Sequence, residues 1–200
     1  MEAIIAQIQG TSMVEWLGTA TGLAGVYLSI KEKVLAWPCF LLCYGLYAYL
    51  SYSASLYAAM TLNACFIPFS LYGWWKWGRS PQGKNGDSLA IASMAPTQRL
   101  VCGGVALFAT LGIGALLSRY TEGAYPYLDA FATALSICAQ WMLGRKYIEN
   151  WIAWLIADMA FIVLWGIQGY WVAVGMFLVF TVLATLGFLS WRKELARNAN

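Results

Sequence analysis

The stretch LYGWWKWG, Leu71 to Gly78, ends the third long apolar run of the chain and places three tryptophans around one lysine. Tryptophan beside lysine is typical of a helix that ends at a membrane surface, because the amphipathic indole rests at the level of the lipid headgroups. We therefore interpret Trp75 and Trp77 mainly as anchors at that surface. Trp74 lies one helical turn from Trp77 toward the membrane interior and is a candidate ligand contact.

The composition on either side of this stretch is that of a membrane protein. Of 200 residues, 61% are apolar and 10% are charged, whereas about a quarter of the residues in a soluble domain are charged. A helix crosses the hydrocarbon core with about 20 residues, and seven runs approach that length. The sequence predicts an all-α integral membrane fold with seven transmembrane helices, at residues 14–30, 35–52, 56–77, 99–118, 128–144, 150–168 and 170–191.

The residues before the first run, MEAIIAQIQGTSM, lack the basic segment and the small-residue cleavage site of a signal peptide. We therefore expect the first run to be retained as a membrane span. In the alternative interpretation, the opening residues form a short amphipathic helix on the membrane surface.

The basic residues indicate the orientation of these spans. With the N-terminus outside, eleven of the twelve Lys and Arg residues fall on the inner side, and Arg119 alone lies outside. Loops on the cytoplasmic side of membrane proteins carry an excess of Lys and Arg. The sequence therefore predicts an N-out, C-in topology in the cell inner membrane.

The residue content excludes several classes of function. The chain has no histidine, and its five cysteines include no CxxC pair, which argues against zinc sites, haem ligation and histidine-based catalytic triads. A net charge of +3 is no signature of nucleic-acid binding. We expect no metal, no cofactor, no enzymatic activity and no nucleic-acid partner.

A shift of 114 residues superimposes the first three runs on the last three without a gap. The matched pairs include Trp37 with Trp151, Gly73 with Gly187, Trp77 with Trp191 and Glu15 with Asp129. The expected organisation is a three-helix repeat at 14–77, a cytoplasmic loop at 78–98, a linker helix at 99–118 and a second three-helix repeat at 128–191. The linker makes the two repeats parallel, and transporters of this kind bind substrate between their repeats near the midplane. Close packing of the linker helix is expected from its glycines, at 103, 104, 112 and 114.

Polar residues line one face of the run 128–144. Asp129, Thr133, Ser136 and Gln140 follow one another at spacings of four, three and four, which places them on one side of a helix. Polar groups are costly against lipid, so this side should meet another helix or a cavity. Two interpretations remain, namely hydrogen bonding between helices and a path for substrate.

Asp158 is the one carboxylate deep inside a run, and it shares a helix face with Trp151, Trp154 and Trp165. A charged side chain at the bilayer centre costs roughly 2.5–3.5 kcal/mol on insertion scales, and no Lys or Arg lies at a comparable depth. Three interpretations remain open. The carboxyl group is protonated, or it accepts hydrogen bonds from Ser, Tyr or Gln side chains, or it awaits a cationic ligand.

The first repeat offers further candidate ligand contacts. One face of the run 56–77 carries Asn63, Ser70 and Trp74, and the run 35–52 supplies Trp37, Tyr44 and Tyr47. If these faces converge with that of Asp158, the cavity has aromatic walls and a single negative charge. Aromatic faces attract cations by about 0.5–2 kcal/mol each, so a planar cationic ring fits this lining better than a sugar or an amino acid.

Two long segments carry a resemblance to a known family. The run WPCFLLCYGLYAYLSYSASLYAAMTLNACFIPFSLYGWWKW, residues 37–77, resembles the first half of the PnuC family of nicotinamide riboside transporters, and DAFATALSICAQWMLGRKYIENWIAWLIADM, residues 129–159, resembles the second half. The resemblance extends from about Val14 to Lys193. It implies a 3+1+3 arrangement similar to that of SWEET transporters, a homotrimer, and facilitated diffusion of a vitamin precursor that a cytoplasmic kinase traps by phosphorylation.

The resemblance also implies binding roles for four residues, Asn63, Trp74, Gln140 and Asp158. The faces described above add Tyr44, Thr133, Ser136 and Trp154 as candidate substrate-binding residues. Several family members have Gln where Asn63 stands and Asn where Asp158 stands, so we expect a retuned pocket. Thiamine, which some relatives transport, also has a cationic aromatic ring and is the alternative substrate. A membrane sensor or scaffold without transport is the alternative class.

Overall fold

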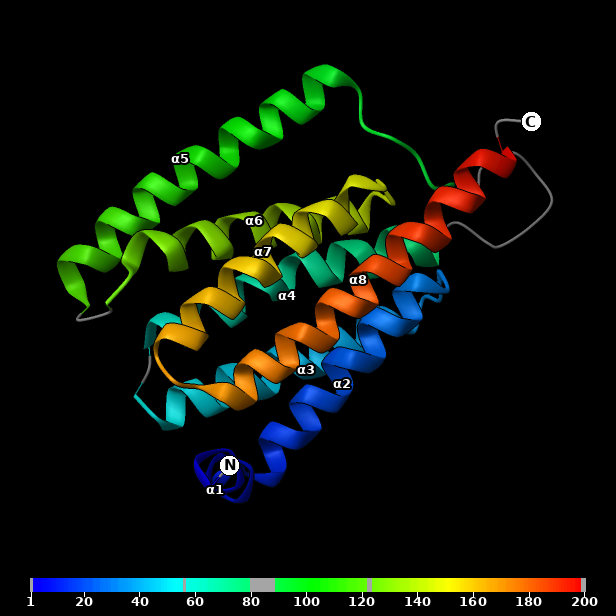
Figure 1. Cartoon of the computed structure of the whole chain (residues 1–200). Coiled ribbons are helices and arrows are strands. Elements are labelled where there is room, and N and C mark those ends of the chain that lie inside the picture. Colours follow the sequence, from blue (N-terminus) through cyan, green and yellow to red (C-terminus); the bar gives the residue numbers. More distant parts are fainter. Residues whose placement is uncertain (1, 56, 80–88, 122–123, 199–200) are drawn as a thin grey trace. The chain divides into compact units, whose positions relative to one another are not determined.

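The computed structural model describes residues 2–55, 57–79, 89–121 and 124–198. Over these residues the chain forms eight helices (Figure 1), in the order α1 (Glu2–Gly10), α2 (Met13–Ile30), α3 (Ala36–Ser53), α4 (Tyr57–Gly78), α5 (Pro96–Tyr120), α6 (Pro126–Gly144), α7 (Glu149–Ile167) and α8 (Trp171–Asn198). The helices belong to two compact units. The first unit comprises Met1–Ala90 with Gly144–Lys146, and the second comprises Ile91–Leu143 with Tyr147–Asn200. We describe each unit by itself.

The expected all-α fold is confirmed, and the seven expected helices form as α2 to α8. The largest difference in bounds is at the end of α8, which continues past the predicted end at residue 191. Residues 192–198, RKELARN, are polar but have good helix formers. The apolar run therefore predicts only the membrane-spanning part of α8, and the helix continues beyond it through polar residues.

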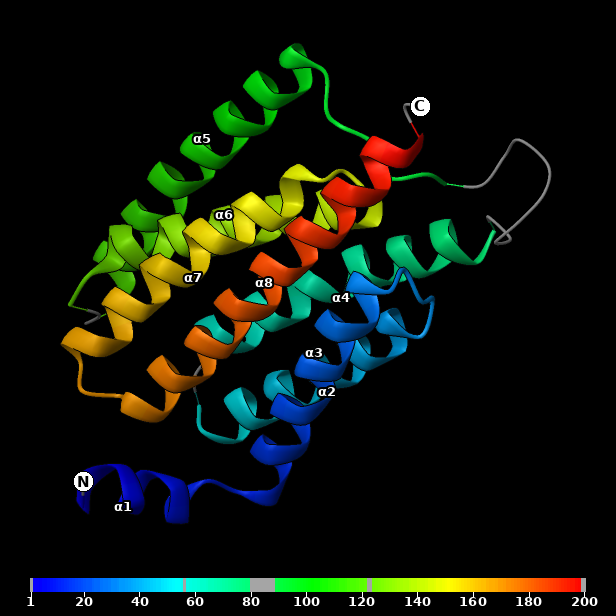
Figure 2. The ribbon, with the colours of Figure 1, turned by 45° about the vertical axis from the view of Figure 1, so that its right-hand side comes forward.

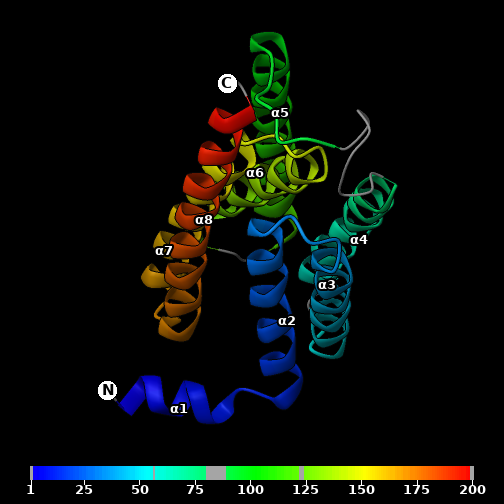
Figure 3. The ribbon, with the colours of Figure 1, turned by 90° about the vertical axis from the view of Figure 1, so that its right-hand side faces the viewer.

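Helix α1 is additional to the seven. It lies across the end of α2 rather than in line with it (Figures 2 and 3). The chain starts a new helix at Ser12, whose Oγ accepts a hydrogen bond from Glu15 N at 3.2 Å while the Glu15 carboxylate accepts one from Ser12 N at 2.6 Å. This reciprocal capping satisfies amide donors that a helix start leaves unpaired. The opening residues thus form the short helix of the alternative interpretation, and its place on a membrane surface stays a prediction.

Three of the described helices, α5, α7 and α8, are long and apolar enough to cross a membrane by length and composition. Helices α2, α3, α4 and α6 have 18 to 22 residues, which at 1.5 Å per residue corresponds to about 27–33 Å. Their many Tyr, Trp, Ser, Thr and Gly residues lower their mean hydropathy. All seven predicted spans are therefore long enough to cross a membrane, and three of them, α5, α7 and α8, are also apolar enough.

In the first unit, α3 packs against both α2 and α4. The ring of Trp37 on α3 occupies the space that a Cβ atom on Gly73 of α4 would need. The same ring meets Trp77 edge to face, with 5.2 Å between centroids and 88° between planes. Glycine at position 73 thus lets the backbone of α4 approach the indole of α3 directly.

The second unit contains the same arrangement between α7 and α8. A Cβ atom on Gly187 would lie 2.7 Å from the ring of Trp151, and Trp151 meets Trp191 edge to face at 5.3 Å and 87°. The positions that the 114-residue shift aligns therefore pack alike in the two units. We call each set, Trp37–Gly73–Trp77 and Trp151–Gly187–Trp191, a Trp–Gly wedge.

Helix α5, predicted as a separate linker between the repeats, belongs to the second compact unit. It approaches α6 closely at Gly114, where the ring of Tyr127 fills the space of a Cβ atom. At Gly103, Gly104 and Gly112 a Cβ atom would meet no described heavy atom within 4 Å. Among the described residues of this chain, close packing of the linker helix is therefore seen at Gly114 and not at the other three glycines.

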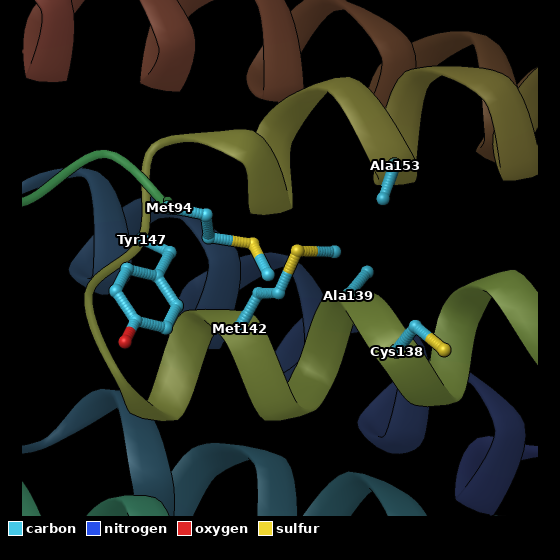
Figure 4. Packing of buried hydrophobic residues seen from close by; sticks show 6 residues of the cluster. All are labelled: Met94, Cys138, Ala139, Met142, Tyr147 and Ala153. Carbon is cyan, nitrogen blue, oxygen red and sulfur yellow. The ribbon is translucent and has the colours of Figure 1, made fainter. Parts of the chain in front are cut away.

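The chain segment before α5 is also part of the second unit. Of the predicted loop 78–98, residues 80–88 lie outside the described residues, and the end of the loop packs into a buried cluster (Figure 4) formed by Met94, Cys138, Ala139, Met142, Tyr147 and Ala153. Ile148 N donates a hydrogen bond to Ala92 O at 2.9 Å. The segment thus connects α5 to the turn between α6 and α7.

Glu149, in the first turn of α7, fastens this segment. Its carboxylate accepts hydrogen bonds from Met94 N at 3.1 Å and from Ser93 Oγ at 2.7 Å, and it pairs with Arg99 at 2.8 Å. Because Arg99 is about half exposed, the ion pair itself contributes little.

We expect Glu149→Gln to lower the free energy of unfolding by about 1–3 kcal/mol, chiefly through weaker hydrogen bonds, measured as thermal unfolding in detergent. Glu194→Gln, in an exposed pair with Arg197 at 3.5 Å, is the control, and an equal loss in both variants would contradict this role.

Candidate substrate-binding site

Asp158 lies on the buried side of α7 in the second unit and is 3% exposed. The exposed apolar side chains of the same helix form a stripe, at Ile152, Ile156, Met159, Val163 and Ile167. Their spacings of three and four residues place them on one helix face, and Asp158 lies away from it. The carboxyl group is therefore turned away from the face that suits lipid.

The carboxyl group of Asp158 is buried without a partner. Within the part of the chain that the structure describes, no hydrogen bond and no ion pair reaches it. The interpretation in which Ser, Tyr or Gln donors satisfy this group therefore has no support. A buried polar group is costly unless it is paired, so the two remaining interpretations are a protonated carboxyl group and a carboxylate that is paired when a cationic ligand binds.

The polar face predicted for α6 is present. Thr133, Ser136 and Gln140 are all buried. The hydroxyl of Ser136 donates to Ala132 O at 2.7 Å, and that of Thr133 donates to Asp129 Oδ1 at 3.4 Å, so both hydrogens are bonded within α6 itself. The two hydroxyl oxygens keep acceptor capacity for a ligand.

Trp154 has a divided environment. It is half-buried, and it packs against the cluster of Met94, Cys138 and Met142. Asp158 follows it by four residues, one turn along the same helix face. Part of the Trp154 ring therefore packs against the buried cluster, and the rest lies on the helix face that carries the Asp158 carboxyl group.

The first unit holds the other three candidates. Asn63 Nδ2 donates to Ala59 O at 2.9 Å, one turn back along α4, which orients the amide group. Trp74 follows eleven residues later, so it lies on the same side of α4, and it is 42% exposed. Tyr44 is the middle ring of a stack in which it lies 6.1 Å from Phe40 and 4.8 Å from Phe66, with nearly parallel planes.

The two remaining tryptophans of the opening stretch differ from each other. Trp77 is 2% exposed, and its Nε1 donates to Gly144 O at 3.2 Å. The interpretation of Trp77 as a surface anchor is therefore wrong, because the ring belongs to a Trp–Gly wedge inside the protein. Trp75 is 53% exposed with the Arg79 guanidinium 4.6 Å from its ring centre, which suits an anchor.

Sequence reasoning did not single out Lys146, although its ammonium group lies 4.9 Å from the ring of Trp77. It also treated Tyr44 and Asp158 as unrelated, although the 114-residue shift aligns them. A tyrosine in a ring stack thus stands in the first unit where the second unit has its buried carboxyl group. At this aligned position the first unit therefore has an aromatic ring and the second unit has a carboxyl group.

Comparison with known proteins identifies the family. A family model described as "Nicotinamide mononucleotide transporter" matches residues 12–193. The chain belongs to this family. The resemblance seen in the two long segments is thereby confirmed, and membership of a transporter family together with the apolar helices makes the chain a membrane protein.

Members of the nicotinamide mononucleotide transporter family similar to this chain include two named "Nicotinamide riboside transporter PnuC". The one from Escherichia coli K12 is 26% identical over 90% of this chain and 85% of its own length, and the one from Neisseria mucosa is 24% identical over 100% and 79%. "Riboflavin/roseoflavin transporter RibM" of Streptomyces davaonensis is 22% identical over 95% and 89%. The fold matches "Crystal structure of the Vitamin B3 transporter PnuC" with a TM-score of 0.76 and 23% identity, over 98% of this chain and 87% of that one.

Proposed function

We propose that this chain is a membrane transporter of nicotinamide riboside that works by facilitated diffusion. The observation that carries the proposal is Asp158, a carboxyl group buried among the helices with no partner in the described chain. Nicotinamide riboside has a pyridinium ring with a fixed positive charge. A carboxylate that lacks a cation of its own is matched to such a ring, and the relatives named for this substrate support the same choice.

The other candidate residues complement the remaining parts of this ligand. Trp74, Trp154 and Tyr44 supply ring faces, which attract a cationic ring by about 0.5–2 kcal/mol each. The amides of Asn63 and Gln140 and the hydroxyls of Thr133 and Ser136 supply donors and acceptors for ribose. We propose all eight residues, Asp158 included, as the substrate-binding set.

We further propose the membrane arrangement that the sequence predicts. Helices α2–α4 and α6–α8 are the two parallel repeats of a 3+1+3 fold with α5 as the linker, and the matching Trp–Gly wedges support this assignment. The N-terminus lies outside the cell inner membrane and the C-terminus inside. The chain works as a homotrimer in the lipid bilayer, and a cytoplasmic kinase traps the imported substrate by phosphorylation.

Facilitated diffusion is proposed over coupled transport because proton relays need several buried acids or histidines. The chain has no histidine, and Asp158 is the one buried carboxylate among the described residues. Uptake into proteoliposomes should follow the substrate gradient alone. A dependence on an imposed proton or sodium gradient would contradict the proposal.

The substrate is tested by calorimetry on the purified protein with nicotinamide riboside, nicotinamide, thiamine and riboflavin. Nicotinamide riboside should bind most tightly. Nicotinamide lacks both the charge and the ribose, and riboflavin lacks the charge. Tighter binding of thiamine would replace the proposed substrate by another cationic ring, and tighter binding of riboflavin would remove the role of charge.

Trp74→Ala should weaken binding of nicotinamide riboside by about 1–2 kcal/mol, or about five- to thirtyfold in Kd, if the ligand ring stacks there. The measurement is quenching of tryptophan fluorescence on titration. Trp75→Ala is the matched control, because Trp75 is the adjacent ring, is similarly exposed and pairs with Arg79. Equal losses in both variants would show that Trp74 has no specific role.

A further inference from the structure

The turn between α6 and α7 is divided between the two compact units. Gly144–Lys146 belongs to the first unit, whereas Leu143 before it and Tyr147 after it belong to the second. The chain therefore passes from one unit to the other on each side of these three residues.

Contacts within the first unit hold the turn. Trp77 Nε1 donates to Gly144 O at 3.2 Å. A Cβ atom on Gly144 would lie 3.3 Å from the ring of Tyr72 and 3.6 Å from the Cα atom of Gly73. Lys146 Nζ pairs with Glu32 Oε2 at 2.8 Å and lies above the ring of Trp77.

The ion pair joins two positions that are equivalent in the sequence. Residues 32 and 146 are 114 positions apart, the distance that aligns the two repeats. Both have left-handed backbone, with φ of 53° at Glu32 and 55° at Lys146, which is uncommon for residues other than glycine. The same strained turn thus follows α2 and α6, and this position is an acid, Glu32, after α2 and a base, Lys146, after α6.

The character of this contact suits one that opens and closes. Lys146 is 8% exposed, but the Glu32 side chain keeps contact with solvent, so water can hydrate the Glu32 carboxylate when the pair separates. An ion pair with one partner in contact with solvent is easier to separate than a fully buried pair or than the interlocked rings of the Trp–Gly wedges. Strained backbone at a functional contact is also commonly kept where a segment must switch.

We propose that Glu32 and Lys146 form the closing contact at the inner mouth of the substrate path, and that this pair separates once in each transport cycle. The proposal rests on the proposed transport function and on the N-out topology, which places the turns after α2 and α6 on the cytoplasmic side. Closure holds residues 144–146 on the first unit, and separation lets the substrate leave toward the cytoplasm.

Cross-linking tests this contact. The five native cysteines are replaced by alanine, and Glu32→Cys and Lys146→Cys are introduced together. Two long side chains meet here at their tips, so a disulfide is too short, and a short bis-methanethiosulfonate reagent is used instead. Cross-linking should reduce uptake of nicotinamide riboside into proteoliposomes about tenfold or more by removing the inward-open population. A reductant should restore uptake, and ligand binding in detergent should persist.

The matched controls separate the possible outcomes. Each single cysteine variant with the same reagent should keep the uptake of the untreated protein. Full uptake by the cross-linked protein would overturn the closing contact alone. If the wild-type protein carries no nicotinamide riboside, the proposed function fails and the closing contact falls with it.

A charge exchange provides a second test without a reagent. Glu32→Lys and Lys146→Glu should each reduce uptake, because each brings two like charges together, and the double variant should recover most of the uptake by restoring an ion pair. Glu194→Gln, which removes an exposed ion pair of α8, should leave uptake unchanged. A double variant no better than the worse single variant would contradict a pairing role.

Discussion

Asp158→Asn is expected to weaken the binding of nicotinamide riboside by about 1.5–3 kcal/mol, or about ten- to 150-fold in Kd. The substitution keeps the size and shape of the side chain and removes its capacity for negative charge. The carboxyl group is buried with no partner in the described chain, and we propose the cationic ring of the ligand as its partner. Isothermal titration of the purified variant measures the effect, and size-exclusion chromatography checks that assembly is intact.

A neutral ligand provides the control for charge. Dihydronicotinamide riboside has nearly the same shape as nicotinamide riboside, but its ring is uncharged. The wild-type protein should prefer the charged form, and Asp158→Asn should lose most of that preference. If Asp158→Asn binds the charged ligand as tightly as the wild type, Asp158 is outside the site and its carboxyl group is protonated, as in the other open interpretation.

Gly187→Ala is expected to lower the free energy of unfolding by about 1–3 kcal/mol, as in other overpacked cores. The new Cβ atom would lie 2.7 Å from the ring of Trp151, and that ring is held against Trp191. Neither indole is a flexible chain end that can move aside. The thermal unfolding midpoint in detergent should therefore fall.

Gly175→Ala in the same helix is the matched control. A Cβ atom there meets no described heavy atom within 4 Å, so the variant should be neutral or more stable by up to about 1 kcal/mol from its better helix propensity. Trp151→Leu combined with Gly187→Ala should recover part of the loss by making room. Equal midpoints for the two alanine variants would show that the wedge does not require glycine at 187.

The helices were predictable because apolar runs and helix length are both visible in the sequence. The 114-residue shift likewise pointed to Trp37, Gly73 and Trp77 before their packing was known. The short helix α1 was harder to predict, since its nine residues lack the length of a span, and the capping of α2 by Ser12 is a local signal. The grouping of α5 with the second unit depends on side-chain contacts that no periodicity encodes.

The candidate site was predictable in part for the same reason. Burial of Asp158 follows from a carboxyl group in an apolar helix, and the face opposite the exposed stripe follows from helix geometry. Trp77 was assigned wrongly because a tryptophan next to a lysine in the sequence can occur both at a membrane surface and in a protein core. The contact of Lys146 with Glu32 joins two turns, and a hydropathy pattern does not indicate which turns lie close together.

The division of the turn after α6 has a consequence for biosynthesis. A ribosome releases the first ninety residues well before it makes Lys146, yet the first unit includes residues 144–146. The ion pair of Glu32 with Lys146 therefore forms only after α6 has been translated. A chain that ends before residue 144 lacks the contacts that Gly144 and Lys146 make with Trp77 and Glu32.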